Sequence, residues 1–403
     1  MKLAKFLTAI LFIFFFNSIH VLSDNNYNLS KNNIEQARSI FKQIEKGEWK
    51  YAIRKAKKSN NKMLEQLVYW LYLNKKMNNA TFQDYQNFIK KNPKIPNINH
   101  LKYLSEYKIN IKSIDPKFII NYFKINKPLS SYGKIKLGEA LINITNSAEG
   151  KKLIKSSFET ANLGNQDIFY LTKTYKNIIG LQDIINRAEW LAWENKTQQL
   201  KHLFKYLPKD YKALYKARYL LAVRSGGVDY AVRSVPDKYK NNQGLLYQRI
   251  KWKLRTGKID SALKLLLKAK KDPKKFNRPD KFWKPTSIII RHQVYKKNYL
   301  VAYQLASQHY LDQGLEYVNA EWLSGWIALK FINEPKKALD HFLNMAKNSH
   351  DPKSKSRAAY WCGKTYEKLN LSYQAKEWYF KSSVYSTAYY GQLGHKKIFP
   401  DKK

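Results

Sequence analysis

Apolar residues recur along the chain at the spacing of amphipathic helices. One stripe occupies positions i, i+3, i+4, i+7 and i+8, at Ile259, Ala262, Leu263, Leu266 and Leu267. A second stripe comprises Trp322, Leu323, Trp326, Ile327 and Leu329. Long alternation of apolar and polar residues is absent, as are the Asn-Gly and Asp-Gly pairs that mark β-hairpins. The pattern therefore predicts an all-α protein.

Proline and capping residues mark the expected helix boundaries. Asp351 precedes Pro352, which places a capping side chain before a proline at the first helical position. The segment 333–335 (Asn-Glu-Pro) follows a similar pattern. Both sites predict the beginning of a helix.

The helices are expected to be paired and repeated. In the last pair, four residues occupy the relative positions of Gly, Tyr, Ala and Phe in a tetratricopeptide-like repeat of about 34 residues: Gly363, Tyr366, Ala375 and Tyr379. About one repeat upstream lie Gly325, Ala338 and Phe342. These spacings predict antiparallel helix pairs stacked into an α-solenoid. An irregular helical bundle is the alternative.

The N-terminus has the pattern of a secretory signal. Lys2 and Lys5 precede an unbroken apolar stretch of 11 residues at 6–16. Small residues near Ser23 predict cleavage after that position, and an uncleaved membrane anchor is the alternative. The expected divisions of the chain are therefore a signal peptide at 1–23, a helical superhelix at 24–355, and a last helix pair with the start of a linker at 356–403. An exported chain without further long apolar stretches is not expected to stay inserted in a membrane.

Candidate chemistry is sparse. No His-Glu-x-x-His, Gly-x-Ser-x-Gly or phosphate-binding glycine loop occurs. Buried glutamates with a raised pKa can act as general acids, but Glu321 and Glu377 are interpreted as structural or surface helix residues. The one cysteine, Cys362, is interpreted as a small buried apolar residue. We therefore expect no catalytic residue, no cofactor and no metal site.

Two further motifs and the tryptophans need an interpretation. The segment 244–247 (Gly-Leu-Leu-Tyr) is interpreted as part of a helix, and Gly226-Gly227 as a turn between helices. Eight tryptophans lie mostly at helical spacing with alanine and leucine: Trp190, Trp193, Trp252, Trp283, Trp322, Trp326, Trp361 and Trp378. Core packing is the preferred interpretation, and stacking on sugars is the alternative.

Several segments in order resemble one known family. They include PLSSYGKIKLGEAL (128–141), NRAEWLAW (186–193), YQRIKWKLRTGKIDSAL (247–263), KFWKPTSIIIRHQVY (281–295), AEWLSGWIALKF (320–331), SRAAYWCGKTYEKL (356–369) and TAYYGQLG (387–394). Together they resemble the superhelical part of soluble lytic murein transglycosylases of the alphaproteobacterial type. The resemblance implies a U-shaped superhelix of helix pairs in the periplasm.

In that family a goose-lysozyme-like domain cleaves the bond between N-acetylmuramic acid and N-acetylglucosamine without hydrolysis. Its catalytic glutamate lies in a Glu-Ser segment, and no Glu-Ser dipeptide occurs in this chain. The resemblance therefore implies a non-catalytic chain without the catalytic domain. Such a chain is expected to bind or position peptidoglycan, alone or with a separately encoded catalytic domain. A tetratricopeptide-like scaffold that binds proteins and no glycan is the alternative.

The positive charge of the chain would suit an anionic binding partner. Lys plus Arg number 74 against 30 for Asp plus Glu, a formal net charge of +44. Such an excess is typical of nucleic-acid binding, but the signal peptide argues against a nucleic-acid partner. Free carboxylates of peptidoglycan peptides are a matching counter-charge outside the cytoplasm. Codon usage of an AT-rich genome, with the lysines on solvated helix faces, is the preferred interpretation of the excess, and attraction of such carboxylates is the alternative.

Overall fold

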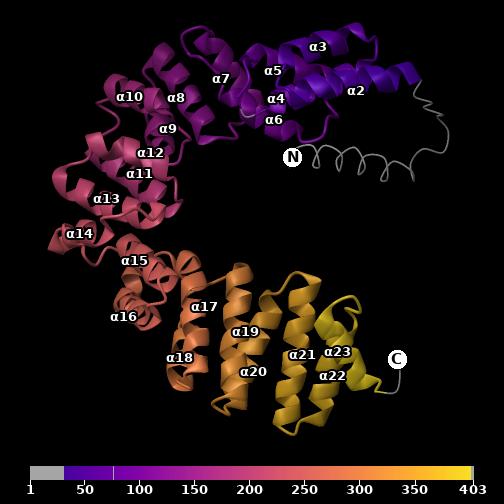
Figure 1. Cartoon of the computed structure of the whole chain (residues 1–403), viewed down its shortest axis with the longest axis vertical. Helices are drawn as coiled ribbons and strands as arrows, with labels where there is room; N and C mark the ends of the chain where they lie inside the picture. Colours follow the sequence, from indigo (N-terminus) through magenta and orange to yellow (C-terminus); the bar gives the residue numbers. More distant parts are fainter. Residues whose placement is uncertain (1–30, 76, 401–403) are drawn as a thin grey trace. The chain divides into compact units, whose positions relative to one another are not determined.

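The regular secondary structure is entirely helical over the residues that the computed structural model of the protein describes, 31–75 and 77–400. Within these ranges no β-strand occurs (Figure 1), which confirms the all-α prediction. The same residues include no helix that is both long and apolar enough to cross a bilayer. The predicted signal peptide at 1–23 lies outside the described residues.

The chain divides into two compact units at Gly180/Leu181. The predicted boundary at 355/356 falls within a helix of the second unit, and the predicted divisions of the chain stay predictions. The helices of the first unit are α2 (Lys31–Glu45), α3 (Trp49–Lys58), α4 (Lys62–Asn74), α5 (Phe82–Lys91), α6 (Ile98–Glu106), α7 (Pro116–Ile125), α8 (Ser131–Thr145), α9 (Ala148–Phe158) and α10 (Asn165–Thr174).

Within the first unit most helices pack on a neighbour in sequence, as in α2 with α3 and α8 with α9. The beginning of α8 is held by Glu106 at the end of α6. The Glu106 carboxylate accepts hydrogen bonds from the backbone N–H groups of Leu129 (2.6 Å) and Ser130 (2.7 Å). Ser130 in turn caps α8 through the Gly133 N–H at 2.8 Å. This polar junction joins two successive helix pairs.

The second unit contains two alternating sets of helices. The A helices are α11 (Leu181–Trp193), α13 (Lys209–Val223), α15 (Gln243–Arg255), α17 (Pro279–Tyr295), α19 (Gly314–Lys330) and α21 (Pro352–Lys368). The B helices are α12 (Thr197–Leu203), α14 (Val228–Arg233), α16 (Ile259–Lys270), α18 (Tyr299–Ser307), α20 (Pro335–Asn348) and α22 (Ser372–Ser383). The unit ends with α23 (Tyr389–Ile398), and short 3₁₀ turns lie at Phe204–Tyr206, Asp237–Tyr239 and Pro273–Lys275.

Each A helix packs on its own B helix and on the next A helix along the unit. Figure 1 shows α17 to α22 as successive antiparallel pairs that lie side by side. The A helices therefore form one layer, here called the A-helix layer. This arrangement confirms the predicted stack of paired helices.

The predicted repeat positions are the contacts that close each pair. A Cβ on Gly325 would lie 2.8 Å from the ring of Phe342, and one on Gly363 would lie 2.7 Å from the ring of Tyr379. Glycine on the A helix thus makes room for the aromatic ring of its B helix. Ala338 is fully buried beside this contact, as the repeat pattern predicts.

The other local predictions are confirmed in part. Asp351 caps α21 by accepting a hydrogen bond from the Ser354 N–H at 3.0 Å. Pro335 begins α20, but Glu334 makes no side-chain cap there. Leu266 of the predicted stripe is fully buried, whereas Leu267 is 50% exposed because i+8 lies at the edge of the stripe.

Candidate ligand-binding pocket on the A-helix layer

A pocket of about 330 Å³ lies on the A-helix layer between α17, α19 and α21. Its lining consists of Asp280, Trp283, Lys284, Ser287 and Arg291 from α17, Glu316, Asn319 and Trp322 from α19, and Arg357 from α21. The other four α17 residues follow Asp280 by three, four, seven and eleven positions, so all five share one face of that helix. The α19 residues are spaced by three for the same reason.

Arg357 and Trp322 form the rigid wall of the pocket. The Arg357 guanidinium lies over the Trp322 ring at 5.1 Å, and its Nη2 donates to Asn319 Oδ1 at 2.8 Å. Trp322 also stacks on Trp326 with ring centroids 5.7 Å apart. The buried Arg357 Nε and Trp322 Nε1 have no hydrogen-bond partner among the described residues.

The rim of the pocket offers both donors and acceptors. Arg291 is exposed and donates from Nη1 to the Ser287 carbonyl oxygen at 3.0 Å, which holds the guanidinium over α17. Glu316 and Asp280 are exposed on the same rim, where the Asp280 carboxylate accepts two hydrogen bonds from Arg278 at 3.1 Å. Seven of the nine lining residues are polar or charged and two are tryptophans, so the pocket suits a polar ligand with a flat face rather than the mainly apolar ligands of most small-molecule sites.

A buried network of one glutamate and two histidines lies on the other side of α19. Glu321 Oε1 is 3.0 Å from His309 Nε2, and Glu321 Oε2 is 2.7 Å from His341 Nδ1. Since His309 Nδ1 accepts the Leu311 N–H at 3.0 Å, the proton of this ring is on Nε2. The Tyr303 hydroxyl is 3.1 Å from Nε2, the other ring nitrogen of His341. Each carboxylate oxygen therefore has its own histidine donor.

This network keeps Glu321 ionised. Burial alone would raise its pKa, but the hydrogen bonds from His309 and His341 lower the pKa to about 2. Trp283, which also lines the pocket, meets His309 edge-on at 6.4 Å between ring centroids. The described part of the chain contains no group of three or more His, Cys, Asp or Glu side chains that could hold a metal ion. Glu321 thus anchors α19 behind the pocket wall.

The other residues singled out in the sequence lie apart from the pocket. Glu377 is exposed on α22. Cys362 is fully buried in α21, and burial raises the pKa of its thiol. The segment 244–247 is part of α15 and Gly226-Gly227 lies in the turn between α13 and α14, as predicted.

The tryptophans divide between the core and the pocket. Trp193 and Trp361 are buried, which confirms core packing for them. Trp283 is also buried, at 7% exposure, yet it borders the pocket together with the half-buried Trp322. Trp190 lies under the Lys196 ammonium at 4.4 Å.

The sequence analysis missed the partners of Glu321. His309 and His341 lie 12 and 20 positions away from it, on either side. A polar residue within the apolar stripe of 320–331 was an available signal of a buried partner. The partners themselves are evident only from the structure, in which α19 packs between the α18–α19 connection, which contains His309, and α20, which contains His341.

Comparisons with known proteins find matches among solved structures but none among family models or curated proteins. In the crystal structure of the APC/C hetero-tetramer Cut9–Hcn1, 76% of a chain aligns with 90% of this chain at 14% identity and a TM-score of 0.28. The 70 kDa soluble lytic transglycosylase SLT70 from Escherichia coli aligns over 72% of its length with 91% of this chain, at 12% identity and a TM-score of 0.31. The complex of the 70-kDa soluble lytic transglycosylase with bulgecin A gives the same coverage at 11% identity and a TM-score of 0.31. Because the identities and TM-scores are this low, the matches assign no function to this chain.

Proposed function

We propose that this chain is an exported helical solenoid that binds peptidoglycan through the pocket on its A-helix layer. The observation that carries the proposal is the pocket wall of Trp322 and Arg357, with Asn319 hydrogen-bonded to Arg357 at 2.8 Å. Export rests on the signal pattern of residues 1–23.

The chemistry of the pocket suits an amino-sugar strand. The flat apolar face of a sugar ring can pack on Trp322, while its hydroxyl and acetamido groups can bond Asn319, Arg291 and Glu316. The volume of about 330 Å³ lies at the small end of the range of about 300–1,000 Å³ for ligand pockets, which suits a short saccharide unit.

The sequence resemblance points to the same helices. Six of the nine lining residues fall within the segments 281–295, 320–331 and 356–369, which resemble murein transglycosylases. The remaining three lie just outside these segments, on α17 and α19. The resemblance and the pocket therefore support the same ligand by separate routes.

Binding is proposed rather than cleavage. A glycan-cleaving acid must be protonated at neutral pH, and the low pKa of Glu321 prevents this. Both of its oxygens are also already engaged by histidine donors. Glu377 is exposed on α22 and does not line the pocket.

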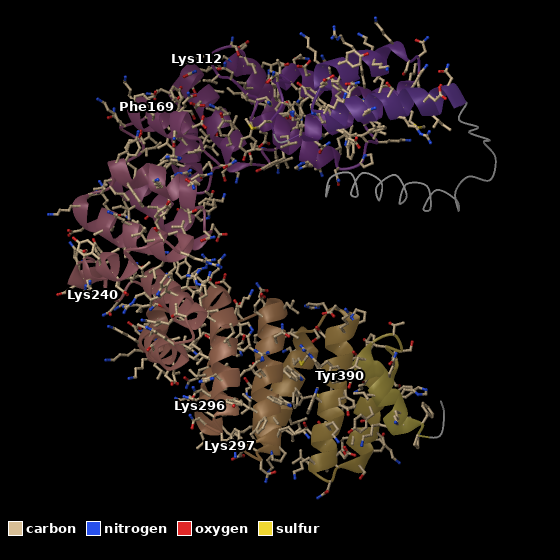
Figure 2. All side chains as sticks on the ribbon, in the orientation of Figure 1. Lys112, Phe169, Lys240, Lys296, Lys297 and Tyr390 are labelled. Atoms are coloured by element: carbon tan, nitrogen blue, oxygen red, sulfur yellow. The ribbon has the colours of Figure 1, made fainter. Side chains whose placement is uncertain are left out.

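Retention on purified murein sacculi tests the proposal. We expect the wild-type chain to remain bound at moderate salt, and Arg291→Ala to weaken retention about three- to tenfold. Lys296→Ala is the matched control, because it also removes one cation from the end of α17. Its side chain pairs with Asp260 at 2.9 Å and lies at the α17–α18 turn (Figure 2). Equal losses in both variants would indicate unspecific charge attraction and contradict the pocket assignment.

No retention of the wild type, together with co-purification of a protein partner, would instead favour the scaffold alternative. Solenoids commonly bind peptides on one extended face. That outcome would overturn the peptidoglycan proposal.

The purified chain is also expected to release no anhydromuropeptides from sacculi. Chromatography of the soluble fraction after prolonged incubation checks this. Release that disappears in Glu377→Gln, or in a Glu321→Gln protein shown to remain folded, would establish cleavage by this chain and contradict the non-catalytic role.

A further inference from the structure

A second feature of the A-helix layer is a group of cations next to the pocket. It is here called the basic cluster and consists of Arg224 at the end of α13, Lys251 and Arg255 one turn apart on α15, and Lys281 and Lys284 one turn apart on α17. These three A helices pack on one another in order. Lys284 also lines the pocket, so the two features adjoin.

The basic cluster contains more positive charge than its surroundings neutralise. Among the described residues no carboxylate forms an ion pair with Arg224, Lys251 or Lys284. Arg255 donates to the Leu221 carbonyl oxygen at 2.8 Å instead. Lys281 pairs with Glu194 at 3.1 Å, but the same carboxylate also receives Arg278 at 3.6 Å. Glu194 therefore serves two cations. Asp280, which pairs with Arg278 at 3.1 Å, is a second carboxylate beside Lys281, so the five cations of the cluster still outnumber the nearby carboxylates.

The concentration of like charge destabilises the charged form of Lys251. Partial burial lowers the pKa of Lys251, and the charges of Arg255, Lys284, Lys281 and Arg224 lower it further. The Lys251 ammonium also lies over the Tyr247 ring at 5.1 Å. Packing unpaired cations together costs stability, and this cost is typical of surfaces selected for binding.

The size of the basic cluster indicates a ligand with several anionic groups. Neighbouring helices are about 8–10 Å apart, so a cluster on three helices extends over roughly 20 Å. A single small anion is too short to reach all five cations. The arginine guanidinium groups favour planar carboxylates, which they can bind through two parallel hydrogen bonds.

We infer that the basic cluster binds the free carboxylates of peptidoglycan stem peptides while the adjoining pocket holds the glycan. This inference rests on the proposed function. It adds a second recognition element, the peptide, and assigns it to residues of α13, α15 and α17, of which only Lys284 also lines the pocket.

The test compares two forms of the same polymer. Murein sacculi with their peptides and glycan strands from which an amidase has removed the peptides are titrated against the full chain. We expect the wild type to prefer the peptide-bearing form, with a preference that falls as salt screens the charges over about 8 Å or less. Lys251→Gln is expected to lose about three- to tenfold in affinity for the peptide-bearing form and nothing for the stripped glycan.

A stability measurement separates binding from structure. Because Lys251 is repelled by its neighbours, Lys251→Gln is expected to keep or raise the melting temperature while it weakens binding. Lys268→Gln removes an exposed lysine from the B helix α16 and serves as the control with unchanged binding.

The outcomes distinguish the two proposals. Equal binding of both murein forms, unaffected by Lys251→Gln, would overturn the carboxylate site and leave the proposed function intact. No binding of either form by the wild type would overturn the proposed function itself. Stronger binding of a phosphodiester polymer than of peptide-bearing murein, lost in Lys251→Gln, would assign the cluster to phosphate and overturn the stem-peptide assignment.

Discussion

Replacing Glu321 by glutamine is expected to remove about 2–4 kcal/mol from the free energy of unfolding at pH 7. The carboxylate accepts a hydrogen bond from the buried His309 at 3.0 Å and another from the half-buried His341 at 2.7 Å. A glutamine amide has one oxygen, so its NH₂ group must face one of the histidines, whose ring then has to present an unprotonated nitrogen to it. The variant therefore loses the charge assistance of both hydrogen bonds and forces one histidine to change its tautomer and its other hydrogen bond.

The same contact predicts a defined dependence on pH. The pKa of Glu321 falls from 4.5 to about 2 in the folded protein, so the carboxylate is held more tightly there than in the unfolded chain. Its contribution is fully present above about pH 4.5 and disappears as the pH falls through 2. The shift corresponds to about 3 kcal/mol. The difference in stability between wild type and Glu321→Gln should therefore shrink across this window.

Denaturant unfolding at a series of pH values from 2 to 7 measures this difference. Other carboxylates with lowered pKa values, such as Glu367, are present in both proteins and cancel. Glu377→Gln, on an exposed position of α22, is the control and should change stability by less than about 0.5 kcal/mol. If Glu321→Gln lowers the free energy of unfolding as much at pH 2 as at pH 7, the carboxylate charge is not the source of the stabilisation.

The helical architecture could be predicted because its determinants are local. A period of 3.6 and the absence of alternation identify helices from short windows of sequence. The contacts Gly325–Phe342 and Gly363–Tyr379 lie within one helix pair and recur with the repeat, so their spacing alone indicates them. Asp351 caps its own helix for the same reason.

The pocket and the basic cluster could not be predicted, because their residues come from different pairs. Asn319 and Arg357 are hydrogen-bonded although 38 positions separate them. Exposed polar residues also have no periodic constraint, so nothing marks Arg291 among the other cations. The total charge of +44 was evident, but its concentration on α13, α15 and α17 depends on how the A helices stack.

The tryptophans show a mixed case. Their helical spacing correctly predicts burial for Trp193 and Trp361. Trp283 obeys the same rule, but one edge of its ring still borders the pocket because α17 packs beside α19 there. Core packing and ligand contact are thus compatible for a large ring, and the two interpretations of the sequence were not exclusive.

The largest effect in the first unit is expected from Gly138→Ala. By helix propensity alone alanine should stabilise the interior of α8 by about 1 kcal/mol. In the structure, however, an added Cβ would lie 2.7 Å from the Gly150 carbonyl oxygen of α9 and 3.0 Å from Ile154 Cγ1. A backbone oxygen cannot rotate away, so α8 and α9 must separate and lose packing. We expect a net loss of about 2–4 kcal/mol.

The experiment decides whether Gly138→Ala lowers or raises the free energy of unfolding. Thermal and denaturant unfolding of Gly138→Ala should be compared with Gly226→Ala, where the added Cβ meets nothing within 4 Å and stability should be unchanged. The reciprocal variant Gly150→Ala places its Cβ 2.7 Å from the Gly138 carbonyl oxygen, so it should lose a similar amount. Once either methyl group has forced the helices apart, the second costs less, and the double variant should lose less than the sum of the two. A Gly138→Ala protein as stable as the wild type would mean that propensity outweighs packing here and that α8 and α9 do not meet through their glycines.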